Sequence, residues 1–146
     1  MKKKSFTLIE VLVFTTIISI FFIAAMSVAV FFLKNIKTQQ YKIIATHLVE
    51  ETIEWLKYEK ESDWNIIASK DINNGSGTIY CLNDLSWDQE GVCNQNFGSP
   101  SIFKRELIIR NLNNPVTKIE LTITVSWNDV GGINKVISKQ ILSIIE

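Results

Sequence analysis

A long uncharged segment near the N-terminus limits most strongly what this chain can form. From Val11 to Leu33 the sequence contains no charged residue, glycine or proline. As a helix this segment would be ~35 Å long at ~1.5 Å per residue, which is enough to cross the hydrocarbon core of a bilayer. It therefore predicts one membrane-spanning helix. The lysines before it, Lys2, Lys3 and Lys4, predict a cytoplasmic N-terminus with the rest of the chain outside.

Three interpretations of this segment compete. A secretory signal peptide explains the basic start and the apolar core, and residues 27–29 (Ser-Val-Ala) resemble its cleavage site, but the apolar run is long for that role. A plain single-pass anchor explains the length and the orientation but leaves Glu10 unexplained. An ionised carboxylate in hydrocarbon costs several kcal/mol unless it is paired, so Glu10 indicates a function of its own. A capping box of Thr7 and Glu10 is the structural alternative.

Residues 2–12, Lys-Lys-Lys-Ser-Phe-Thr-Leu-Ile-Glu-Val-Leu, resemble the prepilin leader and N-terminal motif of type IV pilins and type II secretion pseudopilins. In that family a membrane peptidase cuts after a small residue and methylates the new N-terminal amine, usually that of Phe. The resemblance implies cleavage between Ser5 and Phe6 and N-methylation of Phe6. It also implies that Glu10 is the assembly contact, neutralising the amine of an adjacent subunit. The family usually has Gly before the cut, where this chain has Ser5.

The resemblance also implies partners and a location. The partners are other pilin or pseudopilin subunits, the prepilin peptidase, and an assembly platform in the inner membrane. The precursor is expected as a single-pass inner (cytoplasmic) membrane protein with an extracytoplasmic head, and later in a filament on the cell surface or in the periplasm. The motif does not separate a pilus from a secretion or DNA-uptake system. Residues 48–56 resemble a segment of many minor pilins and favour a minor subunit.

Beyond the apolar segment, the helical pattern continues. No glycine or proline occurs before Gly75. Large apolar residues recur at helical spacings, at Ile36, Ile44, Leu48, Trp55 and Leu56. The sequence therefore predicts that the helix extends to about Ser62 and packs its apolar stripe on a head domain.

The second half of the chain has the alternation of strands. Expected strands are 78–81, 103–110, 118–127 and 135–144. The fold class predicted is α+β and pilin-like, with a long N-terminal helix packed on a small antiparallel β-sheet; its membrane half is apolar and its outer half amphipathic. The expected organisation is a leader at 1–5, a membrane and filament-core helix at 6–33, an amphipathic continuation at 34–62 and a β-rich head at 63–146.

Two cysteines, Cys81 and Cys93, lie close together in the sequence. In an exported domain such a pair predicts one disulfide that closes a short loop, whereas in a reduced compartment both would be free thiols. Three acids in that loop, Asp84, Asp88 and Glu90, match no calcium-loop spacing. We expect them to be solvated.

Composition and motifs favour a structural protein. The full chain has 15 basic and 15 acidic residues, a balance that gives no indication of nucleic-acid binding. His47 is the only histidine and is expected on the helix surface, while the aromatic residues Trp55, Tyr58 and Trp64 are expected to hold the helix on its sheet. No nucleophile-base pair, phosphate loop or metal cluster is visible, so we expect no catalytic residue and no cofactor.

Two other classes stay open. The first is a membrane-anchored or secreted extracytoplasmic binding module, which a ligand groove on the sheet would favour. The second is a membrane-anchored enzyme, which the missing catalytic groups disfavour.

Overall fold

The structure is a computed structural model that describes residues 7–73, 75–129 and 131–144. Contacts divide the chain into two compact units, Met1–Gln40 and Tyr41–Glu146. This division falls inside the segment expected to be the amphipathic continuation of the helix. The assignment of leader, membrane helix and head to their separate roles stays a prediction.

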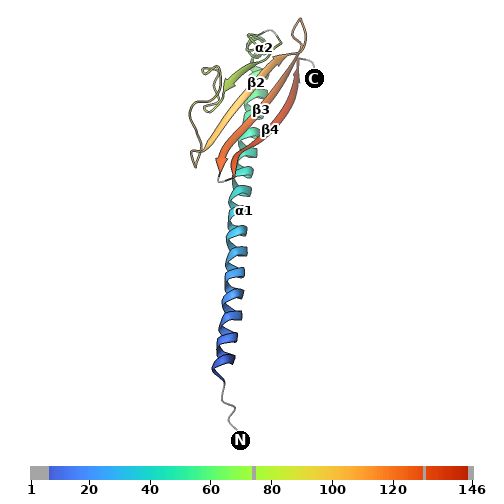
Figure 1. Cartoon of the computed structure of the whole chain (residues 1–146). Coiled ribbons are helices and arrows are strands. Elements are labelled where there is room, and N and C mark those ends of the chain that lie inside the picture. Colours follow the sequence, from blue (N-terminus) through green and yellow to red (C-terminus); the bar gives the residue numbers. More distant parts are fainter. Residues whose placement is uncertain (1–6, 74, 130, 145–146) are drawn as a thin grey trace. The chain divides into compact units, whose positions relative to one another are not determined.

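Helix α1 runs without interruption from Leu8 to Ser62 (Figure 1). The carbonyl of Thr7 accepts the amides of Glu10 at 3.0 Å and Val11 at 3.3 Å, which closes the first turn. No glycine or proline interrupts the helix, so every internal amide can bond to the preceding turn. The predicted end at Ser62 is confirmed, and residue 6, the expected start, lies outside the described residues.

A short helix that the sequence did not predict follows α1. Asp63 has an extended conformation, and its Oδ1 accepts the amide of Asn65 at 2.8 Å. This N-cap begins helix α2 (Trp64–Ala68). Helix α2 buries Ile67 and thereby extends the core beyond the end of α1.

Four strands form one antiparallel meander in the order β1-β2-β3-β4 (Figure 1). They are β1 (Thr78–Cys81), β2 (Phe103–Asn111), β3 (Lys118–Asp129) and β4 (Gly132–Ser143). All four predicted strands are present. The last strand begins earlier than predicted because the β3–β4 register continues to the pair Asp129–Gly132. Gly132 has a φ of 112°, which residues with a side chain rarely adopt.

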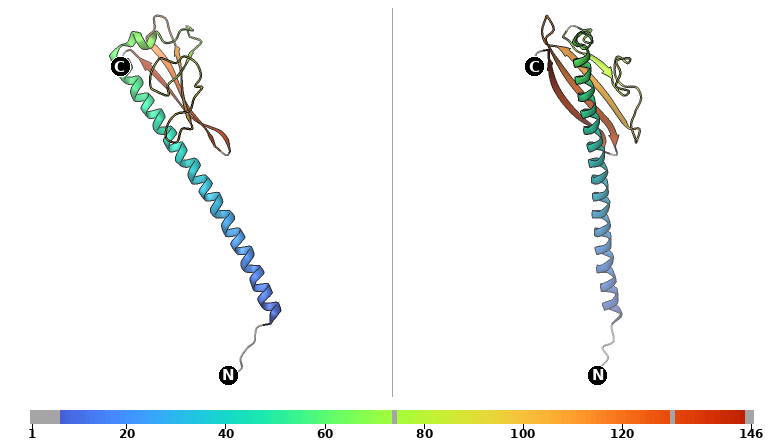
Figure 2. Two further views of the ribbon diagram at one scale, coloured as in Figure 1. Left: turned by 90° about the vertical axis from the view of Figure 1, so that its left-hand side faces the viewer. Right: turned by 180° about the vertical axis from the view of Figure 1, so that it is seen from behind.

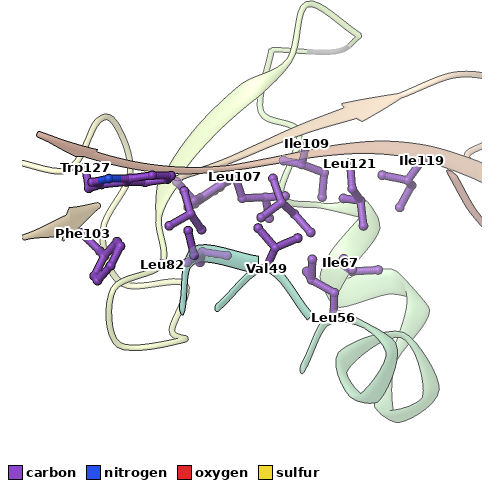
Figure 3. Close-up of a cluster of buried hydrophobic side chains, with 14 residues drawn as sticks. Val49, Leu56, Ile67, Leu82, Phe103, Leu107, Ile109, Ile119, Leu121 and Trp127 are labelled. Carbon is purple, nitrogen blue, oxygen red and sulfur yellow. The ribbon is translucent and has the colours of Figure 1, made fainter. Parts of the chain in front are cut away.

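The core lies between α1 and one face of the sheet (Figure 3). From the sheet, alternate residues of β2 and β3 are buried, namely Phe103, Arg105, Leu107, Ile109, Ile119, Leu121, Ile123, Val125 and Trp127. From the helix, the buried residues recur at spacings of four, three and four, namely Ala45, Val49, Thr52 and Leu56. The helical spacing thus places one narrow face of α1 on the sheet.

The predicted apolar stripe of the helix is largely confirmed, since Leu56 is buried and Ile44, Leu48 and Trp55 pack against the core. Ile44 and Leu48 lie at the margin of the buried face and are only half-buried, and Ile36 is 53% exposed in the first unit. Fully buried Ala45 and Thr52, which were not part of the predicted stripe, share the buried face with Val49 and Leu56. Neither Ala45 nor Thr52 is strongly apolar, so a pattern based on large apolar residues alone misses part of the contact. The Thr52 hydroxyl donates to the Leu48 carbonyl at 2.7 Å, which satisfies it inside the core.

Candidate functional site

The start of α1 places one carboxylate within an apolar surface. Glu10 lies in the first helical turn, and its neighbours Leu8, Ile9, Val11 and Leu12 are all exposed. Glu10 Oε2 lies 3.5 Å from both the amide nitrogen and the hydroxyl oxygen of Thr7. This is the carboxylate half of a capping box, at a distance where a hydrogen bond is weak. The geometry leaves the carboxylate available to a stronger partner.

The rest of the first unit offers an apolar surface. Its four hydroxyl side chains between Val11 and Leu33 donate to backbone carbonyls of the same helix. They are Thr15, Thr16, Ser19 and Ser27, with donor–acceptor distances of 2.8–3.0 Å. Because these hydroxyls are satisfied within the helix, they do not prevent its burial in lipid or among other helices. Among the described residues, α1 is the one helix long and apolar enough to cross a membrane.

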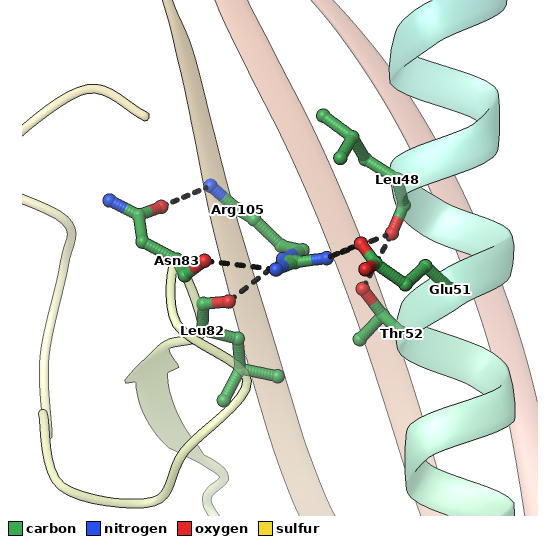
Figure 4. Close-up of polar contacts among 6 residues, drawn as sticks. All are labelled: Leu48, Glu51, Thr52, Leu82, Asn83 and Arg105. Carbon is green, nitrogen blue, oxygen red and sulfur yellow. Dashed lines mark hydrogen bonds and ion pairs between the residues drawn. The ribbon is translucent and has the colours of Figure 1, made fainter. Parts of the chain in front are cut away.

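In the second unit, a buried arginine joins three segments (Figure 4). Arg105 Nε donates to the Leu82 carbonyl at 2.8 Å, and Nη2 donates to the Asn83 carbonyl at 3.0 Å. Nη1 bonds to Glu51 Oε2 at 2.6 Å and to the Leu48 carbonyl at 3.4 Å. The side chain thus links β2 to α1 and to the loop after β1.

The electrostatics of this arginine follow from its burial. Its side chain is 3% exposed, whereas that of Glu51 is 54% exposed. Burial lowers the pKa of the Arg105 guanidinium, while its hydrogen bond to Glu51 and the charges of Glu51 and Asp84 oppose that decrease. The ring of Phe97 lies 4.8 Å from the guanidinium carbon. These contacts hold the Arg105 side chain in place between β2, α1 and the loop after β1.

A buried aspartate organises the turn that leads into β1. Asp71 Oδ2 accepts the amides of Gly75 and Asn111, each at 2.8 Å. Its Oδ1 accepts the Thr78 hydroxyl at 3.3 Å. Neither Arg105 nor Asp71 was predicted from the sequence to have a special role. In the sequence, an aspartate in a turn such as Asp71 looks the same as any solvated loop residue.

The predicted aromatic contacts that hold the helix on its sheet are present in part. Trp55 packs on Trp87 with ring centroids 4.9 Å apart, and Trp64 Nε1 donates to the Val116 carbonyl at 3.0 Å. Tyr58, however, is 68% exposed, so the prediction that it helps to hold the helix on the sheet was wrong. It lies on the side of α1 away from the sheet. Tyr80 also contacts Trp87, and burial, together with Glu90 and Asp71, raises the pKa of its hydroxyl.

The predicted disulfide between Cys81 and Cys93 is present. Its loop lies along the free edge of β1, where the amide of Cys81 donates to Gln89 at 2.9 Å and that of Gly91 donates to Ile79 at 2.8 Å. A polar cavity of about 420 Å³ lies in the same loop.

Candidate metal ligands do not gather in the described part of the chain. Asp84, Asp88 and Glu90 line the loop cavity and are exposed, and no group of three or more acidic, His or Cys side chains among the described residues could hold a metal ion. His47 is exposed on α1, with Nδ1 3.6 Å from Glu50 Oε2. Ser5 and Phe6, the predicted processing site, lie outside the described residues.

Comparison with known proteins agrees with the N-terminal sequence. Residues 1–26 match the family model of the prokaryotic N-terminal methylation motif, which is the signature of type IV pilins and pseudopilins. No curated protein and no solved structure matches the chain. The fold is α+β and pilin-like, with a long N-terminal helix and a four-stranded antiparallel sheet. The motif and fold indicate a pilin-like structural precursor with a membrane anchor.

Proposed function

We propose that this chain is the precursor of a structural subunit, a minor pilin or pseudopilin, of a type IV pilus-like filament or a secretion or DNA-uptake pseudopilus. One observation carries the proposal: the methylation motif at residues 1–26 leads directly into an apolar helix with a single carboxylate, Glu10, in its first turn. The motif implies processing by prepilin peptidase and assembly with other pilin subunits. We assign the chain no catalytic activity.

In the proposed sequence of events, the peptidase cuts between Ser5 and Phe6 and methylates the Phe6 amine. The helix then holds the subunit in the inner membrane with its head outside, until an inner-membrane platform adds it to the filament. On entry into a bundle of apolar helices, the cationic Phe6 amine needs an anion, because an unpaired charge is costly in a medium of low dielectric constant. Glu10 of an adjacent subunit supplies that anion.

This pairing makes Glu10 a sensor of register. A subunit that docks one step out of register leaves both the amine and the carboxylate buried without partners, which is strongly destabilising. Glu10 is exposed on α1, and its bond to Thr7 is long, so little is lost when the carboxylate changes partner. Pairing between subunits is therefore compatible with a capping role in the isolated subunit.

The processing step is tested by mass spectrometry of the mature protein. We expect a chain that begins with N-methylated Phe6. A chain that begins at Val30 would instead indicate a secreted domain released by signal peptidase, and an intact Met1 would indicate a static membrane anchor.

The role of Glu10 is tested by three variants of the full chain, each measured as the amount in sheared filaments relative to the amount in the membrane. Glu10→Val and Glu10→Gln should both remain in the membrane and fail to enter filaments. Gln can still cap the helix but carries no charge, so normal incorporation of Glu10→Gln would reduce Glu10 to a cap. Thr7→Ala is the matched control, because it removes the hydroxyl of the capping box and keeps the charge of Glu10.

A further inference from the structure

The second unit, Tyr41–Glu146, has two layers and therefore two opposite outer faces (Figure 2). One is the side of α1 that points away from the sheet, and the other is the side of the sheet that points away from α1. Chemically these two faces differ.

The outer side of α1 is acidic. The buried residues Ala45, Val49, Thr52 and Leu56 define the inner side, and at ~100° per residue the opposite side carries a row of exposed residues. This row, which we call the acidic helix face, consists of Ile43, His47, Glu50, Glu54, Tyr58 and Glu61. It contains no lysine or arginine and includes two large exposed apolar side chains, Ile43 and Tyr58.

The outer side of the sheet is basic along β4, which among the described strands pairs with β3 alone. In the β3–β4 register, Val136 lies opposite the buried Val125, so the residues at odd positions of β4 point away from the core. These residues form what we call the lysine–isoleucine row: Ile133, Lys135, Ile137, Lys139 and Ile141. All five are exposed, and Ile133 is 81% exposed.

Lysines on an edge strand have an ordinary explanation, since they discourage other strands from pairing with that edge. This explanation accounts for Lys135 and Lys139 but not for the three exposed isoleucines that alternate with them. Within the described part of the chain, neither lysine forms an ion pair. A surface that combines unpaired charges of one sign with aligned apolar side chains is suited to binding a face of the opposite sign.

We propose that the lysine–isoleucine row of one subunit binds the acidic helix face of a second copy of this chain. The inference rests on the proposed function, because it names a contact between neighbouring heads of a filament. Over the whole second unit, acidic residues exceed basic ones by four, with 14 acids against 10 bases between positions 41 and 146. A basic row on an otherwise acidic unit therefore has its complement on another copy.

The two rows match in length. Nine residues of strand from Ile133 to Ile141 span ~27 Å at ~3.4 Å per residue, and the helix from Ile43 to Glu61 also spans ~27 Å at ~1.5 Å per residue. When the centres of the two rows coincide, each lysine lies ~4 Å along the axis from Glu50 or Glu54, within reach of a lysine side chain.

The geometry favours a head-to-tail contact. If two β4 strands paired with each other about Ile137, Lys135 would lie opposite Lys139, and like charges directly opposite are destabilising. Binding of the row to the helix face instead joins two different surfaces, so each subunit keeps one free face of each kind. Contacts of this type extend into open assemblies when they do not close into a ring. Exposed ion pairs are weak, so we expect the contact among subunits already held close together in the filament.

Cross-linking in assembled filaments tests the contact directly. The full chain carries Glu54→Cys together with either Lys135→Cys or Lys139→Cys, and sheared filaments are treated with a short bis-maleimide linker; Cys81 and Cys93 do not react because they are bridged. We expect one of the two double variants to give a ladder of multimers and each single-cysteine variant to stay monomeric. Dimers from the single lysine-position variants, or cross-links only to a different pilin-like chain, would overturn the proposal.

A charge exchange provides the second test. K135E/K139E should lower the amount of chain in sheared filaments about tenfold, equivalent to ~1.4 kcal/mol, and adding E50K/E54K should restore it. K42E/K118E, which changes the net charge equally outside both rows, should have no such effect. If restoration fails while the parent chain, beginning at Phe6, is present in filaments, the head contact is wrong and the proposed function stands. If the parent chain keeps Met1 and never enters filaments, the proposed function itself is wrong.

Discussion

At the scale of single residues, Arg105 joins three segments of the second unit by hydrogen bonds. Its guanidinium group bonds to two carbonyls of the loop after β1, at Leu82 and Asn83, and to Glu51 on α1. A planar guanidinium with several donors can serve three partners at fixed angles, which an ammonium group cannot. Because the side chain is buried, its removal leaves the loop carbonyls without their donors.

We expect Arg105→Met to lower the free energy of unfolding of the head by ~3 kcal/mol, because the carbonyls of Leu82 and Asn83 lose the donors that satisfy them and each unsatisfied buried acceptor costs about 1–3 kcal/mol. The free energy of unfolding of Arg105→Lys should lie between that of Arg105→Met and that of the parent protein. The measurement is urea unfolding in detergent followed by tryptophan fluorescence, since all four tryptophans lie in the second unit.

Arg110→Met is the matched control on the same strand. Arg110 is half exposed and its Nη1 lies 3.7 Å from Glu120 Oε2, so we expect a loss below ~1 kcal/mol. Equal losses of unfolding free energy in the two arginine variants would show that the hydrogen bonds of Arg105 stabilise the head no more than an ordinary surface ion pair does.

At the scale of elements, the two edge strands of the sheet differ because, in the part of the chain that the structure describes, β1 is covered by a loop and β4 is not. The disulfide loop covers β1 through the bonds of Cys81 to Gln89 and of Gly91 to Ile79. Strand β4 has no neighbour on its outer side within the described residues. The covered edge cannot accept another strand, so any contact through a sheet edge must use β4.

The disulfide should hold the loop on β1. We expect Cys81→Ser/Cys93→Ser to lower the free energy of unfolding by ~3 kcal/mol, as the chain-entropy model gives for a loop of this length. In hydrogen exchange of the double variant, the amides at positions 81 and 91 should exchange faster, while the amides of β3 should lose protection only through global unfolding. Reduced parent protein is the control and should behave like the double variant; a variant as stable as the oxidised parent would contradict the prediction.

At the scale of the whole molecule, the chain separates two physical tasks. The described part of Met1–Gln40 is an apolar helix whose side chains are exposed apart from a half-buried position near its end. Tyr41–Glu146 contains the complete buried core, the disulfide and the Arg105 network. The first unit can therefore be specialised for lipid and other helices without any demand on the folding of the second.

We expect residues 41–146 to fold alone. The truncated chain should be soluble, should unfold cooperatively, and should have a Tm within about 5 °C of the full chain, since ~1 kcal/mol shifts the Tm of such a domain by a similar amount. A chain that begins at residue 54 is the control. It lacks Ala45, Val49 and Thr52, so the sheet loses much of its cover and the protein should aggregate. Aggregation of the longer fragment as well would show that the first unit is needed for folding.

Much of this architecture could be predicted from local patterns. The apolar helix, its continuation to Ser62, the four strands and the disulfide all follow from spacings of a few residues, because helices and strands expose their faces with fixed periods. Phe103, Leu107 and Ile109 were recognisable as one face of a strand for this reason. The motif around Glu10 is equally local.

Burial of individual side chains depended on the tertiary structure. Arg105 occupies a core position in the alternation of β2, yet nothing local shows that two carbonyls and Glu51 meet it there. Ala45 and Thr52 are fully buried in the helix contact although neither is strongly apolar, and Tyr58 is exposed, because the position of the sheet decides which helix residues are covered. The sequence by itself determined that α1 and the four strands form and which segment suits a membrane; only the packing of those elements decided which polar groups are buried together, since burial is a property of two surfaces that meet.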